Sequence, residues 1–466
     1  MSFTNSYNIA IIGGGILGTS IAYFLSNAIQ NSKKKVILIE QEYDVARHTS
    51  SRNTGKVHAP FLYDPVKKPL SAKAAFIGFN MLKDYCKIKS LPFKQDGVLE
   101  VATYDKGIDI LYKHLEWGHS NGLRESELRF LQKDEVFEME PHVRCLAGLY
   151  CLKDSSVNYG AITKQLMEDA KQFGCKIVTG SKVSKITNTA GHIVIYTNNG
   201  AKFNTEYIVN TAGGNSLDIA HNTGVATDYT DLHFRGEYWQ APHKYHNLTK
   251  LSVYSVPKYP EYPFLDPHWI VRVDGIREVG PNAVPVFGPY AYSWSNNLRY
   301  FIPKIFESSM MRGTRRILID KQFISLASNE LKSSLSKTAM INRAREFLPE
   351  IEPSLFIRRG TAGIRSILID RYGKFVPDTM IVKNDYSLHI LNYNSPGATG
   401  ALPIAAMVAN QLIEDGIVTM TNYSSSYSCR SNKEGTVDGE VQGKGVPEIN
   451  NNSIWDIKAI SDRVTI

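Results

Sequence analysis

The first 40 residues alternate between unbroken apolar runs and polar or glycine-rich segments. Residues 9–12 form one apolar run and residues 36–39 another, and runs of this length are typical of strands buried on both faces. Residues 16–25 are apolar over a length that favours a helix. This strand–helix–strand order predicts an α/β fold.

The same pattern predicts further elements along the chain. Helices are expected over residues 73–88, 105–121, 157–173 and 404–413. A strand–turn–strand is expected over 93–102, a strand over 176–178, a hairpin over 193–203, and a strand running into a turn over 207–215. Residues 232–280 are rich in strand-forming and aromatic residues, which indicates a separate antiparallel sheet. Residues 293–350 are expected to be helical and basic, with Pro303 in the first turn of a helix.

Three glycines in GxGxxG spacing lie between the first strand and the first helix. Gly13 would allow the tight turn, Gly15 would let a phosphate approach the backbone, and Gly18 would let the helix pack on the strand. A pyrophosphate would lie at the helix N-terminus, where unpaired N–H groups favour an anion. The second strand ends at Glu40, about 20 residues beyond the motif, where a carboxylate would accept from ribose hydroxyls. The motif therefore predicts bound NAD or FAD, and a glycine-rich turn in another α/β protein is the alternative.

A second glycine-rich segment, at residues 394–403, lies between a predicted strand and the helix at 404–413. The polar segment 47–64 follows the strand that would bind ribose, and the strand at 207–211 runs into a turn of small residues. Both are expected to border the nucleotide. The second loop favours FAD, because the chain has one N-terminal GxGxxG unit and no later repeat to hold a nicotinamide nucleotide.

Four segments carry patterns that are more specific. They are SSRNTGKVHAPFLYDP (50–65), FRGEYW (234–239), the run at 256–284 that ends REVGPNAV, and the blocks AGIRSILIDRYGKFVPD and YNSPGATGALPI within 362–404. In these segments the chain resembles the L-2-hydroxyglutarate oxidase/dehydrogenase family, among the FAD-dependent oxidoreductases of the D-amino-acid-oxidase type. The resemblance covers residues 5–417 in order. Two residues depart from it: Lys56 stands at an apolar position of the family pattern, and Pro60 stands where glycine is usual.

The resemblance implies an α/β fold in which a Rossmann-like FAD-binding domain is interleaved with an α+β substrate domain built on an antiparallel sheet. The FAD-binding domain is expected at residues 5–75, 145–230 and 355–418, and the substrate domain at 76–144 and 231–354. FAD contacts are expected at Gly13, Gly15, Ile16, Leu17, Gly18, Glu40, Ser50, Ser51, Asn53, Thr54, Gly55, Val183, Ala212, Gly213, Gly363, Gly397, Ala398, Thr399 and Gly400. Glycines that serve only packing are the alternative.

Oxidation of a 2-hydroxy acid requires a cation that fixes the carboxylate and a base that takes the hydroxyl proton, while the Cα hydrogen faces the flavin. Arginine suits the first task, because its planar fork pairs with a carboxylate through two hydrogen bonds. The candidates are Arg365, just before the second loop, Arg235 and Arg272. Arg235 could instead form a structural salt bridge, for instance with Glu237.

Histidine suits the second task, because its ordinary pKa lies near neutral pH. His58 and His268 match histidines of the family, and the alternative for His58 is a hydrogen bond to the flavin alone. Tyr238 could orient the carboxylate or simply pack within the sheet.

The resemblance implies an enzyme that oxidises L-2-hydroxyglutarate to 2-oxoglutarate, with hydride transfer to flavin and onward transfer to quinone or oxygen. The same scaffold acting on malate, glycerol 3-phosphate or an amino acid is the first alternative. A non-catalytic dinucleotide-binding protein is the alternative from another class.

The net charge of +8 is concentrated in one region, since residues 293–345 contain ten Lys or Arg against three Asp or Glu. Arg312, Arg315 and Arg316 stand among apolar residues, so the segment 298–318 is expected to contact anionic membrane and allow electron transfer to membrane quinone. An ordinary solvated helix face is the alternative. No nucleic-acid-binding motif accompanies the basic residues, so no nucleic acid partner is expected.

The five cysteines are scattered and show no metal-ligand spacing, which argues against a metal site and is typical of a reducing cytoplasm. No apolar run is long enough for a membrane-spanning helix, and the first strand begins with no room for a cleaved signal. A cytoplasmic protein is expected, with a peripheral position on the inner face of the membrane as a variant. The polar residues 419–466 predict a flexible tail, apart from a candidate short element at 454–460.

Overall fold

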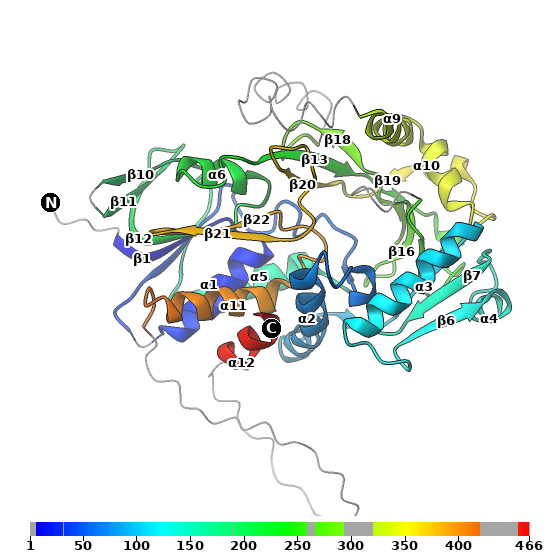
Figure 1. The fold of residues 1–466 in the computed structure, drawn as a ribbon, viewed down its shortest axis with the longest axis horizontal. Coiled ribbons are helices and arrows are strands. Elements are labelled where there is room, and N and C mark those ends of the chain that lie inside the picture. Colours follow the sequence, from blue (N-terminus) through cyan, green and yellow to red (C-terminus); the bar gives the residue numbers. More distant parts are fainter. Residues whose placement is uncertain are drawn as a thin grey trace, which may run out of the picture.

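A mainly parallel sheet, here called the first sheet, is built around β1 (Figure 1). The computed structural model describes residues 6–30, 32–189, 191–258, 266–292, 320–419 and 455–465. In the first sheet β1 lies between β2 and β12, parallel to both, and β9 and β22 extend it in parallel. Its strands are β1 (Ser6–Ile12), β2 (Val36–Ile39), β9 (Lys176–Val178), β10 (Val183–Thr189), β11 (His192–Thr197), β12 (Lys202–Asn210), β21 (Met380–Asn384) and β22 (Ser387–Leu391).

Helices cover one face of the first sheet (Figure 1). The β10–β11 hairpin, at one end of the same sheet, packs against part of the other face. Ile9 and Ile11 of β1 pack with the helices, whereas Ala10 and Ile12 pack with apolar residues of the β10–β11 hairpin. Because successive residues of a strand face opposite sides, the unbroken apolar run buries both faces, as predicted. The helices of this half are α1 (Ile16–Ala28), α2 (Pro69–Ile88), α5 (Tyr159–Gln172), α6 (Ser216–Asn222), α11 (Ala401–Glu414) and α12 (Ile457–Thr465).

A second sheet lies beside the first and is antiparallel except where β15 pairs with β5 (Figure 1). In order, its strands are β19 (Arg358–Arg359), β14 (Trp239–Gln240), β17 (Arg277–Gly280), β16 (His268–Val271), β15 (Ser252–Ser255), β5 (Val98–Ala102), β7 (Ala147–Cys151) and β6 (Leu128–Gln132). The buried Trp269 belongs to the core on one face of this sheet. The helices of this half are α3 (Asp105–Ser120), α4 (Lys133–Met139), α9 (Lys321–Leu335) and α10 (Lys337–Ala344). The expected combination of a Rossmann-like sheet with an antiparallel sheet is confirmed.

Two small sheets complete the described strands. One consists of β18 (Val284–Val286), β13 (Thr230–Gly236) and β20 (Gly363–Ile369), and the other of β3 (Lys56–Val57), β8 (Ser155–Val157) and β4 (Phe93–Lys94). Both bring together segments that lie far apart in the sequence, because β13 pairs with β20 and β3 with β8. Short 3-10 turns occur at Pro60–Leu62, Gly213–Asn215, His243–Tyr245 and Pro353–Leu355.

Strand pairing corrects two expected domain boundaries. We expected residues 145–230 and 355–418 in the FAD-binding domain, but β7 and β19 lie in the second sheet. β7 pairs antiparallel with β5 through five residue pairs, from Val98 opposite Cys151 to Ala102 opposite Ala147. Composition cannot reveal such a pairing, because strands of the two sheets are equally apolar.

The short element considered at 454–460 within the polar tail corresponds to α12, which extends to Thr465. There α12 packs against α11 and α2, and Ile457 and Val464 are buried in the same core as α1. The ring of Trp455 lies against Tyr23, Phe24 and Tyr85. The chain end therefore belongs to the helical layer beneath the first sheet.

Two expectations fall on residues that the structure leaves undescribed. The basic segment 298–318 lies wholly within the gap at 293–319, as does Pro303. Among the residues that are described, no helix is long and apolar enough to cross a membrane.

Candidate active site

The site begins where β1, β2 and β12 end at the same level. Ile12 lies opposite Ile39 in β2 and opposite Asn210 in β12. The glycine motif, Glu40 and the turn after Asn210 therefore meet at the carboxyl edge of the first sheet, which is the usual ligand position in such folds. Gly13 has a φ of +110°, a conformation that favours glycine.

Helix α1 approaches this edge through Gly18. A Cβ on Gly18 would meet the Gly13 carbonyl oxygen and would lie 2.6 Å from Thr211 Oγ1. At the start of α1 the N–H of Ile16 donates to Ser50 Oγ at 2.9 Å. The glycine spacing thus sets how closely α1 approaches β12, and the polar segment after β2 folds over the N-terminus of α1.

Glu40 is buried beside the glycine turn. Its carboxylate accepts hydrogen bonds from the N–H groups of Gly14 at 2.5 Å and Glu42 at 2.8 Å. Burial raises the pKa of Glu40 above its ordinary value, and these hydrogen bonds oppose the rise. Glu40 lines the same part of the cleft as Val183 and Ala212.

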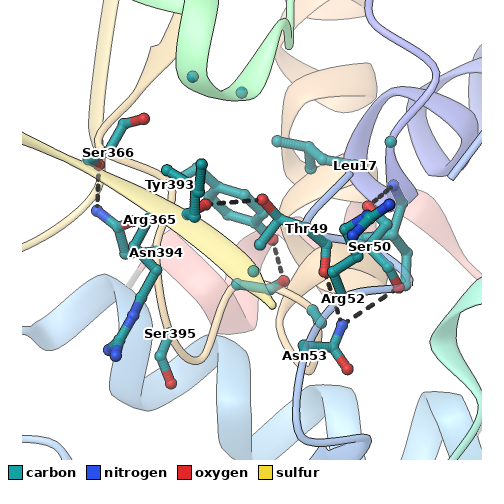
Figure 2. Close-up of a pocket in the computed structure, with 18 of the residues that line it drawn as sticks. Leu17, Thr49, Ser50, Arg52, Asn53, Arg365, Ser366, Tyr393, Asn394 and Ser395 are labelled. Atoms are coloured by element: carbon teal, nitrogen blue, oxygen red, sulfur yellow. Dashed lines mark hydrogen bonds between the residues drawn. The ribbon is translucent and has the colours of Figure 1, made fainter. Parts of the chain in front are cut away.

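A second part of the cleft lies between the segment 49–54 and the loop 393–399. Figure 2 shows Arg365, Asn394 and Ser395 on one side of the view and Ser50 and Asn53 on the other. Thr49 Oγ1 donates to the carbonyl of Ile364 at 3.0 Å, and Asn394 Nδ2 donates to the carbonyl of Ser366 at 2.8 Å. Both sides are therefore fastened to β20.

The two parts form one continuous cleft, because both are lined by Gly15, Ser50 and Gly213. Most of the expected cofactor residues lie along it. Those that line it are Gly13, Gly15, Ile16, Leu17, Glu40, Ser50, Asn53, Thr54, Val183, Ala212, Gly213, Gly363, Gly397, Ala398 and Thr399. The cleft thus has the glycine lining that is typical of dinucleotide sites.

Four expected cofactor residues do not line the cleft but support its walls. Gly18 packs α1 on the sheet, and a Cβ on Gly400 would lie 2.8 Å from Ala74. Ser51 Oγ donates to the carbonyl of Ala46 at 2.5 Å. Gly55 takes a φ of +71° in the turn before β3. The corresponding predictions of direct contact are not supported by this geometry.

Arg365 lines the cleft on β20 and is half-buried. Burial lowers the pKa of its guanidinium from the ordinary value. The guanidinium of Arg365 has no hydrogen-bond or ion-pair partner within the described ranges, which omit residues 259–265 and 293–319. A guanidinium in this position favours an anionic ligand such as a carboxylate.

His58 lines the same part of the cleft, and its backbone is held by a hydrogen bond. Its N–H donates to Thr399 Oγ1 at 3.1 Å, and Tyr159 Oη lies 3.0 Å from the same hydroxyl. Its Nδ1 lies 3.4 Å from Asp154 Oδ2. The second glycine loop therefore fixes His58, so that a histidine and a guanidinium share one cavity.

The side chains of the two other arginine candidates are each paired with a carboxylate. Arg235 is 2% exposed and its Nη2 lies 3.0 Å from Glu237 Oε1, which is the structural salt bridge considered as the alternative. Arg272 Nε donates to Glu278 Oε2 at 2.5 Å. Neither lines the cleft, so the structure does not support direct substrate contact for either.

His268 and Tyr238 differ in access to the cleft. His268 does not line it, and burial lowers its pKa to about 3. Its ring lies 4.4 Å, between centroids, from that of Tyr254. Tyr238 does line the cleft, and burial raises its pKa to about 12. His268 is thus a neutral core residue rather than a base open to substrate.

Sequence reasoning missed several residues of the cleft. Arg52, Tyr393 and Asn394 line it, and their position inside the quoted family blocks was a signal that could have found them. Lys56 was noted only as a departure from the family pattern, although it lines the cleft. Asp154 lies beside His58 with no sequence signal, because only the β3–β8 pairing brings it there.

No group of three or more His, Cys, Asp or Glu side chains is placed to hold a metal ion, so far as the structure describes the chain.

Comparisons with known proteins agree with the geometry. The family model described as FAD dependent oxidoreductase, abbreviated DAO, matches residues 8–411. The chain is 31% identical to the L-2-hydroxyglutarate dehydrogenase of Indibacter alkaliphilus, over 86% of this chain and 98% of that protein. It is 31% identical to the mitochondrial L-2-hydroxyglutarate dehydrogenase of Caenorhabditis elegans, over 87% and 93%, and 28% identical to the Escherichia coli K12 enzyme of that name, over 87% and 93%.

Solved structures show the same fold. The L-α-glycerophosphate oxidase of Mycoplasma pneumoniae with FAD bound superimposes with a TM-score of 0.70 at 22% identity, covering 91% of this chain and 97% of that one. The glycine oxidase of Geobacillus kaustophilus superimposes with a TM-score of 0.64 at 15% identity, covering 90% and 97%.

The buried, neutral state of His268 predicts a loss of stability in mild acid. As pH falls below about 6.5, the unfolded chain gains a proton at this histidine, which the folded chain does not bind until about pH 3. The stability is therefore present above the unfolded pKa and is lost as pH falls. Between pH 7 and pH 5 the free energy of unfolding should therefore fall by about 2 kcal/mol through this histidine.

Urea unfolding at both pH values measures this fall. It should be smaller by that amount in His268→Gln, whereas the exposed His243→Gln control should behave like wild type. Equal pH dependence in all three proteins would contradict the burial of a neutral His268.

Proposed function

This chain belongs to the DAO family of FAD-dependent oxidoreductases, and on that premise we propose that it oxidises L-2-hydroxyglutarate to 2-oxoglutarate. The observation that carries the proposal is that Arg365 and His58 line the same cavity, beside the loop 393–399 at one end of the cleft. Relatives of that name support the choice of substrate.

The residues of the cleft fit FAD along its length. We infer that the carboxylate of Glu40 receives the ribose hydroxyls, and that the pyrophosphate lies against Gly13 and Gly15 at the N-terminus of α1. These glycines leave backbone where a side chain would fill the space, since a Cβ on Gly15 would lie 3.1 Å from Ser50 Oγ. The isoalloxazine would lie between Asn53 and the second loop, near Thr399. When bound, FAD accepts a hydride from the substrate Cα and passes the electrons on to quinone or oxygen.

We assign Arg365 to the substrate carboxylate. Its guanidinium lacks a partner in the described residues and its pKa is lowered by burial, so a bound carboxylate would supply the missing charge. Fixing the carboxylate restricts the orientation of the hydroxyl-bearing carbon, which is the geometric condition for reaction. Tyr238 lies in the same cavity with its hydroxyl protonated, and we propose that it donates to the substrate.

We assign His58 to the substrate hydroxyl. A base is required there, because oxidation of the alcohol releases the hydroxyl proton. The ring is held beside Asp154 and is partly exposed to the cavity, at 16% of its side-chain surface. His58 thus combines access with a fixed position, which His268 lacks.

The substrate assignment is tested by anaerobic bleaching of the FAD-loaded protein. We expect L-2-hydroxyglutarate to remove the absorbance of the oxidised flavin faster than D-2-hydroxyglutarate, malate, glycerol 3-phosphate or amino acids, because relatives of this chain are named for that substrate. Bleaching by glycerol 3-phosphate or an amino acid alone would move the protein to that substrate. A flavin reduced by dithionite but by no member of the panel would contradict oxidation of a hydroxy acid.

Arg365→Met should lower kcat/KM for the hydroxy acid about 100-fold while FAD content stays that of wild type. A charged hydrogen-bonded pair contributes about 1.5–3 kcal/mol, and each 1.4 kcal/mol corresponds to tenfold. Steady-state kinetics and the flavin-to-protein absorbance ratio measure the two effects. Arg358→Met, at an exposed arginine of the same region, is the control. Unchanged kcat/KM in Arg365→Met would remove this residue from the substrate site.

We also propose that the basic segment 298–318 places the enzyme on the anionic inner face of the membrane, where quinone is available; the support is the charge and apolar pattern of the sequence. Sedimentation with anionic liposomes should fall when Arg312, Arg315 and Arg316 are changed to Glu. Equal charge change at exposed Lys87, Lys106 and Lys171 is the control. Equal binding by all three proteins would contradict a specific contact.

A further inference from the structure

A buried cluster of charged residues lies directly behind His58. The side chains of Lys56 and Asp154 are fully buried, and that of Asp96 is 3% exposed. Lys56 Nζ lies 3.2 Å from Asp96 Oδ1 and 3.5 Å from Asp154 Oδ1. It also donates to Ser156 Oγ at 2.9 Å. One ammonium group thus faces two carboxylates, and all three side chains are buried.

The small sheet β3–β8–β4 creates this cluster. Lys56 pairs with Ser156 across β3 and β8, and Lys94 pairs with Ser156 across β4 and β8. Asp154 stands just before β8, and Asp96 follows β4 by two residues. The pairing of β8 with both β3 and β4 therefore brings the three charged residues together.

The two carboxylates of the cluster differ in their hydrogen bonds. Asp96 accepts from Lys56 and also from Ser156 Oγ at 2.8 Å. In contrast, neither oxygen of Asp154 has a hydrogen-bond partner among the residues that the structure describes. Its nearest cationic or donor groups are Lys56 Nζ at 3.5 Å and His58 Nδ1 at 3.4 Å. A buried carboxylate without a donor is costly, so Asp154 favours a proton on His58 Nδ1.

We propose that Asp154 is a positioning residue, anchored by Lys56, which keeps the proton of neutral His58 on Nδ1 and leaves Nε2 as the acceptor. The inference deepens the proposed function, on which its catalytic part rests. At 3.4 Å the two atoms do not yet form a hydrogen bond, and contacts of this kind in a site without ligand tighten when the ligand binds.

The proton transfer then follows from this arrangement. The substrate O–H bond breaks, an N–H bond forms at Nε2, and His58 becomes an imidazolium with a proton on both nitrogens. Asp154 stabilises that positive charge, since it is the nearby carboxylate not already satisfied by hydrogen bonds. This step moves a proton only; the electrons leave with the Cα hydrogen to the flavin.

Asp154→Asn gives a sharp test, because the amide has one acceptor and one donor end. Lys56 Nζ can only donate, so the amide oxygen should turn to Lys56 and the amide NH₂ to His58. Nδ1 must then accept, which moves the ring proton to Nε2 and removes the acceptor that the substrate hydroxyl needs. Asp96→Asn is the matched control, since it changes the same charge beside Lys56 but leaves Asp154 next to His58.

The first readout is the tautomer of His58 in the FAD-loaded protein, which needs no turnover. With ¹⁵N-labelled histidine at about pH 9, where an ordinary histidine is neutral, His58→Gln identifies the His58 signals by their loss. We expect wild type and Asp96→Asn to show the proton on Nδ1, and Asp154→Asn to show it on Nε2. A proton on Nε2 in wild type, or the same tautomer in all three proteins, would overturn the inference.

The second readout is kinetic and uses whichever hydroxy acid bleaches the flavin. Asp154→Asn should lower kcat about 10²- to 10⁴-fold with KM changed less than about threefold. It should also raise the solvent deuterium isotope effect on kcat, because proton transfer becomes rate-limiting. The kcat of Asp96→Asn should fall by a factor at least ten times smaller than that of Asp154→Asn. A normal kcat in Asp154→Asn would overturn the inference, while the proposed function would stand. If the wild-type protein oxidised no hydroxy acid, the proposed function would be overturned. The tautomer measurement would then decide the inference.

Discussion

The cleft depends on one packing constraint, the approach of α1 to the ends of β1 and β12 with no side chain between them. Gly18 meets the Gly13 carbonyl and Thr211, so any larger residue would separate the helix from the sheet. The parallel register ends β1, β2 and β12 together, which places Glu40 beside the glycine turn. The N-terminus of α1, the buried carboxylate and the small residues after β12 then form one continuous binding surface for a dinucleotide.

The other end of the cleft depends on buried charge rather than on packing. Arg365 is held half-buried on β20, and its guanidinium has no ion-pair partner among the described residues, while Arg235 and Arg272 are each paired with a glutamate. Behind His58, two carboxylates share one ammonium group. Burying unbalanced charge costs stability, and such sites are commonly functional. An anionic substrate would pair with the Arg365 guanidinium, and a proton on His58 Nδ1 would give Asp154 the hydrogen-bond donor that it lacks.

Much of this arrangement could be predicted from the sequence, and the failures share a cause. Runs such as residues 9–12 and the spacing of Gly13, Gly15 and Gly18 depend on local order, so they predicted the first sheet and the nucleotide edge. The roles of Arg235 and His268 could not be predicted, since nothing local tells a paired or buried group from an exposed one. The position of Asp154 beside His58 could not be predicted for the same reason, because it depends on the pairing of β3 with β8. The docking of α12 depends on contacts with α2 and α11, whereas composition indicated a flexible tail.

The central claim is that Arg365 and His58 together form the substrate site of a 2-hydroxy acid oxidoreductase. A crystal structure of the FAD-loaded protein with 2-oxoglutarate, the proposed product, tests it most directly. We predict that a product carboxylate binds the Arg365 guanidinium at about 2.7–2.9 Å, with the keto oxygen next to His58 Nε2, from which it accepts a hydrogen bond when both ring nitrogens carry a proton. A product bound elsewhere in the cleft, with both side chains left uncontacted, would contradict the account.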